Sequence, residues 1–414
     1  MKHLFSEPAP LDPAQIPHGF SFASTACGLK ASKGPDLALI TSGEPATTAA
    51  VFTTNRVKAA PVLVSQEHLR TSGTEIRAVI ANSGNANCAT GAAGLAAARA
   101  TAAAVARELG CKAEQVLVCS TGVIGVPLEA KKIVGAVPGL VKSQAGSPEA
   151  HAGVARAIMT TDTRAKWAAA SCRIGKKEVR VLGCAKGAGM IHPQMATMLA
   201  FVVTDAALSP MQAQRALERA AATTFNTVSV DGDTSTNDSL ILLANGTAGN
   251  PIIRSAGVHL RQFVKALESV CRELALAIVA DGEGATPVAE IEVRGSPSEA
   301  LAAHVARTVA SSALVKTALA GADPNWGRIL AAAGRAFWPK RVSLDYSKVE
   351  IRVAGILVCR QGQAHPFDEA AAHKKMLERY VPIVLDFKSG SGRATVWTCD
   401  FTADYVRINA SYRT

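Results

Sequence analysis

The sequence predicts a layered α/β (α+β) fold, and three observations support this prediction. Short apolar runs at residues 37–40, 78–81, 116–119 and 240–244 end in Gly or Asn, and they are continuous rather than alternating. Such runs are typical of strands covered on both faces. Helical segments with recognisable ends lie between them. Hydrophobic residues make up 48% of the 414 residues, with 33 Gly, which fits a layered enzyme with a large core.

The helices are indicated by their end signals. Residues 94–109 are Ala-rich and stop at Gly110, a residue suited to the left-handed C-cap position. Ser209 and Ser296 each precede a proline, which is the pattern of an N-cap serine with proline at the first helical position. We assign these residues structural roles and no chemistry.

The chain divides into a main body and a smaller unit. Residues 348–353 alternate strictly between apolar and charged side chains, which indicates a sheet with one wet face. We predict a main domain over residues 1–284 and a smaller α+β domain over residues 285–395. The C-terminal segment, 396–414, is predicted to return to the active site of the main body through a strand at Tyr405 to Ala410.

Composition excludes several classes of function. The net charge of +11 comes from scattered basic residues, and aromatic residues make up 5%, so the chain attracts small anions rather than nucleic acid. Nine Cys without a C-x-x-C pair, and a beginning without a long apolar stretch, predict a cytoplasmic protein. No apolar run approaches the ~20 residues that span a bilayer, so no membrane association is expected.

The common motifs for metals and cofactors are missing from the sequence. Gly187-Ala188-Gly189 lacks the third glycine of a dinucleotide site. The run that starts at Asp231 resembles a calcium loop over five positions, but Thr236 replaces the required glycine. We interpret it as a hydrogen-bonded turn, and we expect neither a metal nor a bound cofactor.

The most informative segment is K-G-A-G-M-I-H-P-Q-M-A-T-M-L-A-F, residues 186–201, because it places Ala196-Thr197 after a glycine-rich loop. If the Thr197 hydroxyl attacks the carbonyl of Ala196, the chain divides there and Thr197 becomes a new N-terminus. Its α-amine, with a pKa of roughly 7.7–8.0, can then act as its own general base. From this segment alone, a turn that enters a buried strand is the simpler interpretation.

Other polar residues fit an acyl transfer. Ser120-Thr121-Gly122 follows a predicted strand, and the Thr121 hydroxyl with the Gly122 amide supplies two donors for an oxyanion. Lys186 can bind a substrate carboxylate, and Glu283 lies between two glycines that let a ligand approach.

Taken together, these segments resemble the ornithine acetyltransferases, or glutamate N-acetyltransferases, of arginine biosynthesis. The resemblance covers nearly the whole chain. It runs through N-S-G-N-A-N-C-A-T-G (82–91), S-T-G-V-I-G (120–125), I-M-T-T-D-T (158–163), K-G-A-G-M-I-H-P-Q-M-A-T-M-L (186–199), D-G-D-T-S-T-N-D (231–238), A-D-G-E-G-A-T (280–286), L-V-K-T-A-L-A-G-A-D-P-N-W-G-R-I-L (314–330) and N-A-S-Y-R-T (409–414).

The resemblance implies a fold, a reaction and a site. The fold is a four-layer αββα sandwich like that of N-terminal-nucleophile hydrolases, with the smaller α+β domain beside it. Self-cleavage gives an α chain, 1–196, and a β chain, 197–414, assembled as an α2β2 heterotetramer. Thr197 takes the acetyl group from N-acetylornithine and passes it to glutamate, with acetyl-CoA as a further donor in some members. Thr121 and Gly122 stabilise the oxyanion, and the substrate-binding residues are Thr160, Lys186, Thr197, Glu283, Asn409 and Thr414.

Two other interpretations stay open at this stage. A self-processed N-terminal-threonine amidohydrolase or aminopeptidase uses the same chemistry but gives the acyl group to water. A non-catalytic α/β binding protein leaves Thr197 at the start of an ordinary strand.

Overall fold

The computed structural model describes residues 2–192, 198–336 and 344–411. Its helices are α1 Ala60–Ser72, α2 Gly91–Leu109, α3 Ala130–Lys142, α4 Pro148–Ala157, α5 Pro210–Thr223, α6 Val258–Ala280, α7 Glu299–Ala310, α8 Ala313–Ala320, α9 Trp326–Gly334, α10 Glu369–Met376 and α11 Ala403–Ser411. Short 3-10 helices cover Lys2–Phe5, Pro13–Gln15, Ala113–Gln115, Phe225–Thr227 and Tyr346–Lys348.

The strands form two sheets. They are β1 Phe20–Thr25, β2 Leu37–Phe52, β3 Ile76–Asn85, β4 Val116–Val123, β5 Lys166–Ile174, β6 Lys177–Lys186, β7 Leu199–Thr204, β8 Val228–Ser229, β9 Ser239–Ala244, β10 Val288–Ser296, β11 Glu350–Val353, β12 Ile356–Arg360, β13 Gln363–Ala364, β14 Tyr380–Asp386 and β15 Gly392–Cys399. The four apolar runs predicted as strands lie in β2, β3, β4 and β9, so those predictions are confirmed.

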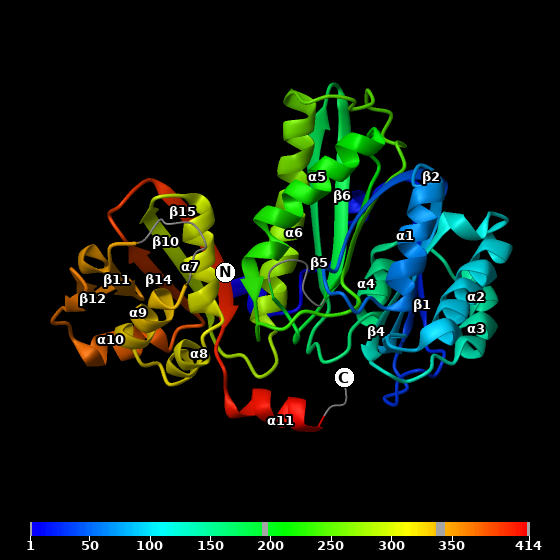
Figure 1. Cartoon of the computed structure of the whole chain (residues 1–414). Coiled ribbons are helices and arrows are strands. Elements are labelled where there is room, and N and C mark those ends of the chain that lie inside the picture. The colour runs from blue at the N-terminus through cyan, green and yellow to red at the C-terminus, as the bar shows by residue number, and fades with distance from the viewer. Residues whose placement is uncertain (1, 193–197, 337–343, 412–414) are drawn as a thin grey trace.

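The large sheet has the order β4-β3-β2-β9-β7-β6-β5, with β1 beside β2. This sheet has two halves, and its longest strand, β2, takes part in both. The first residues of β2 pair with β1 and β3, and its last residues, Thr47 to Phe52, pair with β9. The register with β3 shifts between Thr41 and Ala46, and Figure 1 shows β2 curving over from one half of the sheet to the other.

The inner faces of the two halves share one core. Ile40 and Leu117 of the first half belong to the same buried cluster as Phe201 and Ile241 of the second. Helices α1, α2 and α3 pack on the outer face of the first half, and α5 and α6 pack on the outer face of the second. The layers therefore run α-β-β-α, as predicted (Figure 1).

The smaller domain is built on the second sheet, in the order β13-β12-β11-β14-β10-β15-β8. Helices α7 and α9 contribute to its core. The alternation predicted for residues 348–353 appears in β11, where Ile351 and Val353 are buried. Strand β15 extends to Cys399, and β8 comes from the main body and pairs with Trp397 and Thr398, so the sheet itself connects the two parts.

Two local predictions are wrong. Residues 405–410 form helix α11 rather than a strand. The helix puts Tyr405 and Asn409, four residues apart, on one face, whereas a strand would need a neighbouring edge for its backbone bonds. Ser298 rather than Ser296 caps α7, because its side chain accepts the amide of Leu301. The end of α2 at Gly110, with φ 64°, is confirmed.

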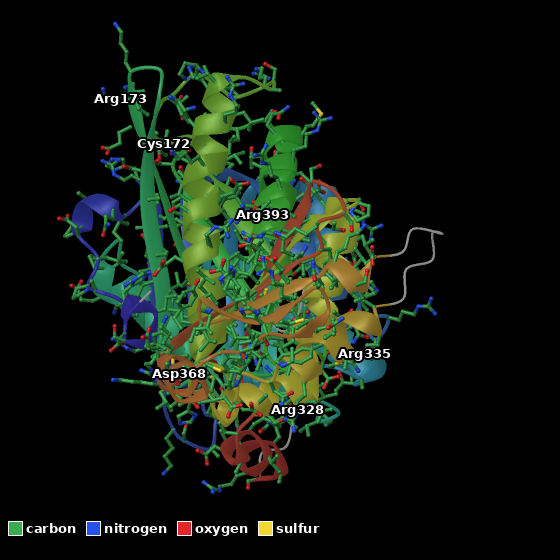
Figure 2. All side chains as sticks on the ribbon, turned by 90° about the vertical axis from the view of Figure 1, so that its left-hand side faces the viewer. Cys172, Arg173, Arg328, Arg335, Asp368 and Arg393 are labelled. Atoms are coloured by element: carbon green, nitrogen blue, oxygen red, sulfur yellow. The ribbon has the colours of Figure 1, made fainter. Side chains whose placement is uncertain are left out.

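Strands β5 and β6 form a long hairpin, and its tip and its base lie at different ends of the molecule. Ile174 pairs with Lys177 at the tip, and Lys166 pairs with Ala185 at the base. Figure 2 shows Cys172 and Arg173 near the tip, at the opposite end of the molecule from α11. The predicted site residue Lys186 ends β6 at the base of this hairpin.

Candidate functional site

A pocket joins segments that are far apart in the sequence, and its empty space is about 550 Å³ with the open solvent at its mouth included. Strands β4 and β6, the loops that follow α4 and α6, and helix α11 all contribute to its wall. Six predicted site residues line it: Thr121, Gly122, Thr160, Lys186, Glu283 and Asn409. The other predicted residues, Ala196, Thr197 and Thr414, lie outside the described residues.

The end of β4 is shaped by a glycine. Gly122 has φ 131°, and a Cβ atom there would stand 2.4 Å from the backbone carbon of Gly84 on β3, so a larger residue does not fit. Next to it, the buried Thr121 hydroxyl accepts a hydrogen bond from Lys186 Nζ at 3.2 Å. Because an ammonium only donates, the Thr121 O–H stays available to donate to a developing oxyanion.

Lys186 is an ammonium group held inside the protein. Its side chain is buried, and burial lowers its pKa, while the carboxylates of Asp162, Asp238 and Glu283 oppose this effect. A buried cation that still faces a pocket can pair with a carboxylate of a ligand at little further desolvation cost.

Glu283 reaches the pocket because its neighbours are small. A Cβ atom at Gly189 would lie 2.6 Å from the Glu283 carboxylate, so the glycine allows this close approach. The amide of Glu283 donates to the carbonyl of Ala188 at 2.9 Å, and its Oε2 accepts from Asn409 Nδ2 at 2.7 Å. The described part of the pocket therefore presents the ammonium of Lys186 and the carboxylate of Glu283, which suits a ligand that carries both charges.

Two aspartates outside the predicted site residues hold the chain on either side of residues 193–197. Asp231 accepts the amides of Met190 at 2.6 Å and Ile191 at 2.9 Å. Asp238 accepts the amide of Met198 at 3.0 Å. Burial raises the pKa of Asp231 to about 6 and that of Asp238 well above its usual value. Both aspartates lie in the motif 231–238. Carboxylates next to a predicted buried strand need hydrogen-bond partners, and this was the sequence signal that could have indicated their role.

The interpretation of this motif as a hydrogen-bonded turn is supported, because Asp231 also accepts the amide of Asp233 at 3.2 Å. Asn237 donates its side-chain amide to the carbonyls of Ala86 and Ser120, which joins the turn to β4. In the described ranges no group of three His, Cys, Asp or Glu side chains is arranged to hold a metal ion. Within the same residues, no helix is long and apolar enough to cross a membrane.

Comparisons with known proteins agree with these features. The profile of the ArgJ family matches residues 21–414. The arginine biosynthesis bifunctional protein ArgJ of Thermosynechococcus vestitus is 48% identical over 412 residues, 96% of each chain. The protein of that name from Chlorobaculum tepidum is 45% identical over 413 residues and the full length of both chains. A crystal structure of the protein of that name from Bacillus halodurans matches with a TM-score of 0.50 and 40% sequence identity. The match covers 52% of this chain and 100% of the solved chain.

The fold, the pocket and these matches define an acetyltransferase that acts on small molecules in arginine biosynthesis. The chain belongs to the ArgJ family.

Proposed function

We propose that the chain transfers an acetyl group from N2-acetylornithine to glutamate through an acetylated Thr197. The observation that carries this proposal is the pocket that joins Lys186 and Glu283 to Thr121 and Gly122 at the end of β4. Both substrates are amino acids, so Lys186 can take an α-carboxylate of either one. Glu283 can meet the cationic side chain of ornithine, and Thr121 and Gly122 can stabilise the tetrahedral oxyanion.

The reaction has two half-reactions. Thr197 Oγ attacks the acetyl carbon of N2-acetylornithine, the C–N bond breaks, and the departing amine receives the hydroxyl proton through the Thr197 α-amine. The neutral α-amine of glutamate then attacks the acetyl ester, the C–O bond breaks, and Thr197 recovers its proton. Ornithine and N-acetylglutamate are the products.

Self-cleavage between Ala196 and Thr197 prepares this nucleophile. Lys186 and Leu199 are partners in the pairing of β6 with β7, so the chain leaves and re-enters the sheet beside the pocket. This pairing supports a role for Thr197, which lies two positions before Leu199. The solved Bacillus halodurans chain covers 52% of this chain, and a β chain of 414 − 196 = 218 residues is a similar share.

We also propose how the cleaved chains assemble, where the protein acts and which second donor it uses. The cleaved chains assemble as an α2β2 heterotetramer in the cytoplasm, where the nine cysteines stay free thiols, as they are here. No bound cofactor takes part. The curated relatives are named bifunctional, and we propose that acetyl-CoA is the second acetyl donor.

The test supplies labelled N2-acetylornithine with and without glutamate. We expect ornithine and N-acetylglutamate to form in equal amounts and only when glutamate is present. Release of free acetate at the same rate with and without glutamate would instead identify an amidohydrolase. Absence of turnover together with one uncut chain would indicate a binding protein. A parallel assay with acetyl-CoA as the sole donor tests the second activity.

A further inference from the structure

We infer that Asp162, Lys166 and Asp281 form a buried triad that positions three walls of the pocket. This inference rests on the proposed function, because it assigns the triad a role in binding amino-acid substrates. None of the three residues is a predicted site residue.

The triad is an ion-pair system in the protein interior. Lys166 Nζ lies 2.7 Å from Asp162 Oδ1 and 2.6 Å from Asp281 Oδ2. The side chains of all three residues are at most 1% exposed. Burial of three charges is costly, so the ion pairs by themselves are weak evidence for added stability.

Asp162 connects the triad to two walls of the pocket. Its Oδ1 accepts the amide of Gly187, the residue after Lys186, at 2.7 Å, and its Oδ2 accepts the amide of Thr160 at 3.0 Å. A displacement of this carboxylate therefore moves the backbone at both predicted substrate-binding residues, Lys186 and Thr160.

Asp281 connects the triad to the third wall. It follows the last turn of α6 and precedes Glu283 by two residues. It accepts the amide of Thr163 at 3.1 Å and also the Thr163 hydroxyl, and it pairs with Arg164 at 3.2 Å. Lys166 thus ties the segment of Glu283 to the segments of Thr160 and Lys186 through its two partners.

The charge of Asp162 also acts directly on Lys186. Burial by itself would raise the pKa of Asp162. This pKa nevertheless lies well below its usual value, because the positive charges of Lys166 and Lys186 stabilise the carboxylate. In return, Asp162 is the foremost of the carboxylates that oppose the lowering of the Lys186 pKa by burial. The charged groups that act on Lys186 are Asp162, Lys166, Asp238 and Glu283, with Lys30 nearby. Without the Asp162 charge, Lys186 keeps the repulsion of Lys166 and loses its proton more readily.

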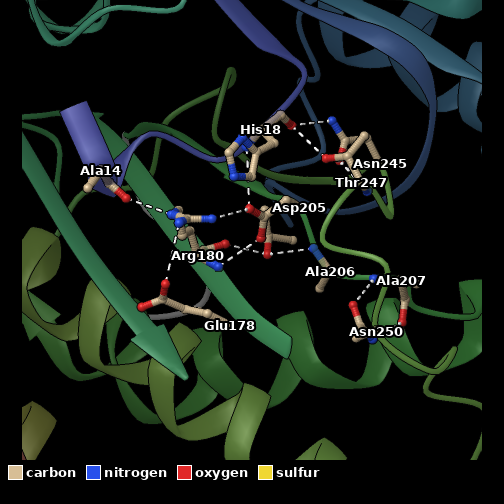
Figure 3. A network of polar contacts seen from close by, with 11 residues as sticks. Ala14, His18, Glu178, Arg180, Asp205, Ala206, Ala207, Asn245, Thr247 and Asn250 are labelled. Atoms are coloured by element: carbon tan, nitrogen blue, oxygen red, sulfur yellow. Dashed lines mark hydrogen bonds and ion pairs between the residues drawn. The ribbon is translucent and has the colours of Figure 1, made fainter. Parts of the chain in front are cut away.

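The same sheet contains a matched control at its other end. Asp205 is a buried carboxylate that accepts the amide of Arg180 at 2.8 Å and pairs with the guanidinium of Arg180 (Figure 3). In the pairing of β6 with β7, Val181 is the partner of Thr204 and Lys186 is the partner of Leu199. Five residues of strand separate the two sites by about 17 Å. Asp205→Asn therefore removes a buried, paired carboxylate without touching the pocket.

The experiment compares Asp162→Asn, Asp281→Asn and Asp205→Asn as purified, processed enzymes. It measures kcat and KM for both substrates from pH 6 to 9, and ornithine binding by calorimetry over the same range. We expect Asp162→Asn to raise KM and the ornithine Kd roughly 10- to 100-fold, the range for a lost bond to a charged group. Its binding should weaken further as the pH rises, because Lys186 deprotonates.

The other two variants separate positioning from stability. Asp281→Asn should raise KM with less added pH dependence than Asp162→Asn, because the charged groups with the largest effect on Lys186 include Asp162 and not Asp281. It also tests the triad if Asp162→Asn does not fold. Asp205→Asn should lower the melting temperature but leave KM and Kd unchanged. Binding by Asp162→Asn or Asp281→Asn that equals that of Asp205→Asn overturns the inference.

Calorimetry distinguishes this inference from the proposed function. Wild-type protein that binds ornithine but transfers no acetyl group contradicts the proposed function, and the triad is then judged by binding alone. Wild-type protein that neither binds nor transfers contradicts both.

Discussion

Asn409 donates its side-chain amide to the Glu283 carboxylate at 2.7 Å, across 126 positions of sequence. The contact requires α11 to lie against the loop that follows α6. Gly284, with φ 69°, allows this, because a Cβ atom there would stand 2.6 Å from the amide nitrogen of Tyr405. The C-terminal helix is therefore part of the pocket wall and holds its carboxylate.

Removal of this donor should weaken substrate binding. We expect Asn409→Ala to raise KM for N2-acetylornithine roughly fivefold, below the 10- to 100-fold range for a bond to a charged group because Asn409 is exposed. Asn409→Asp should be worse, since it places a second carboxylate beside Glu283. Steady-state kinetics measure both. Arg407→Ala is the control, because Arg407 is 76% exposed on the same helix and pairs with Asp404; an equal effect there would contradict a specific role for Asn409.

Gly122 should not tolerate a side chain. In Gly122→Ala the new Cβ would collide with Gly84 and the backbone would be strained at φ 131°, so we expect a loss of at least ~1–3 kcal/mol of stability together with most of the transfer activity. Gly125→Ala is the matched control just after the same strand, because φ is 80° there but no described atom beyond its chain neighbours lies within 4 Å of the added Cβ. It should cost about 1–2 kcal/mol in thermal or urea unfolding and keep the pocket intact.

His151 should make the protein sensitive to acid. Its ring is buried against Phe22, and among the described residues its Nδ1 has no hydrogen-bond partner. Burial lowers the pKa of His151 to about 3, so the unfolded chain binds a proton that the folded chain excludes. Stability should therefore fall as the pH drops from about 6.5 towards 3, by up to ~1.4 kcal/mol per pH unit from this group.

The measurement for His151 is urea unfolding at several pH values. His151→Leu should lose this part of the acid sensitivity and be more stable than the wild type at pH 5. His18→Leu replaces an exposed histidine and should follow the wild-type curve. A His151→Leu curve that also follows the wild type would show that His151 does not cause the effect.

Cleavage should depend on the hydroxyl at position 197. Thr197→Ala should leave one chain of 414 residues and abolish transfer, whereas Thr197→Ser should retain some of each. Denaturing electrophoresis and N-terminal sequencing measure the cut, which should leave pieces of 196 and 414 − 196 = 218 residues. A processed and active alanine variant would refute the assignment of Thr197.

Much of the layer structure was predictable, because strands that are buried on both faces are apolar at every position of a short segment. The runs at 78–81 and 116–119 are apolar at every position, as strands covered on both faces must be, and they became β3 and β4. The full length of β2 was not predictable, since Gly43 and Pro45 read as breaks, yet the strand continues through them to Phe52. Pairing with β3 and then β9 supplies the backbone partners that these residues do not encode locally.

Local sequence thus established the apolar strands, the glycine turns and the polar residue types suited to acyl transfer. The gathering of Thr160, Lys186 and Glu283 around one pocket depended on the tertiary structure. So did the triad of Lys166 with Asp162 and Asp281, because the two carboxylates are 119 positions apart and nothing near either one marks it as buried. A charge can stay buried only when the folded chain brings its partner within hydrogen-bond distance, and that distance is a property of the packed sheets rather than of any single segment.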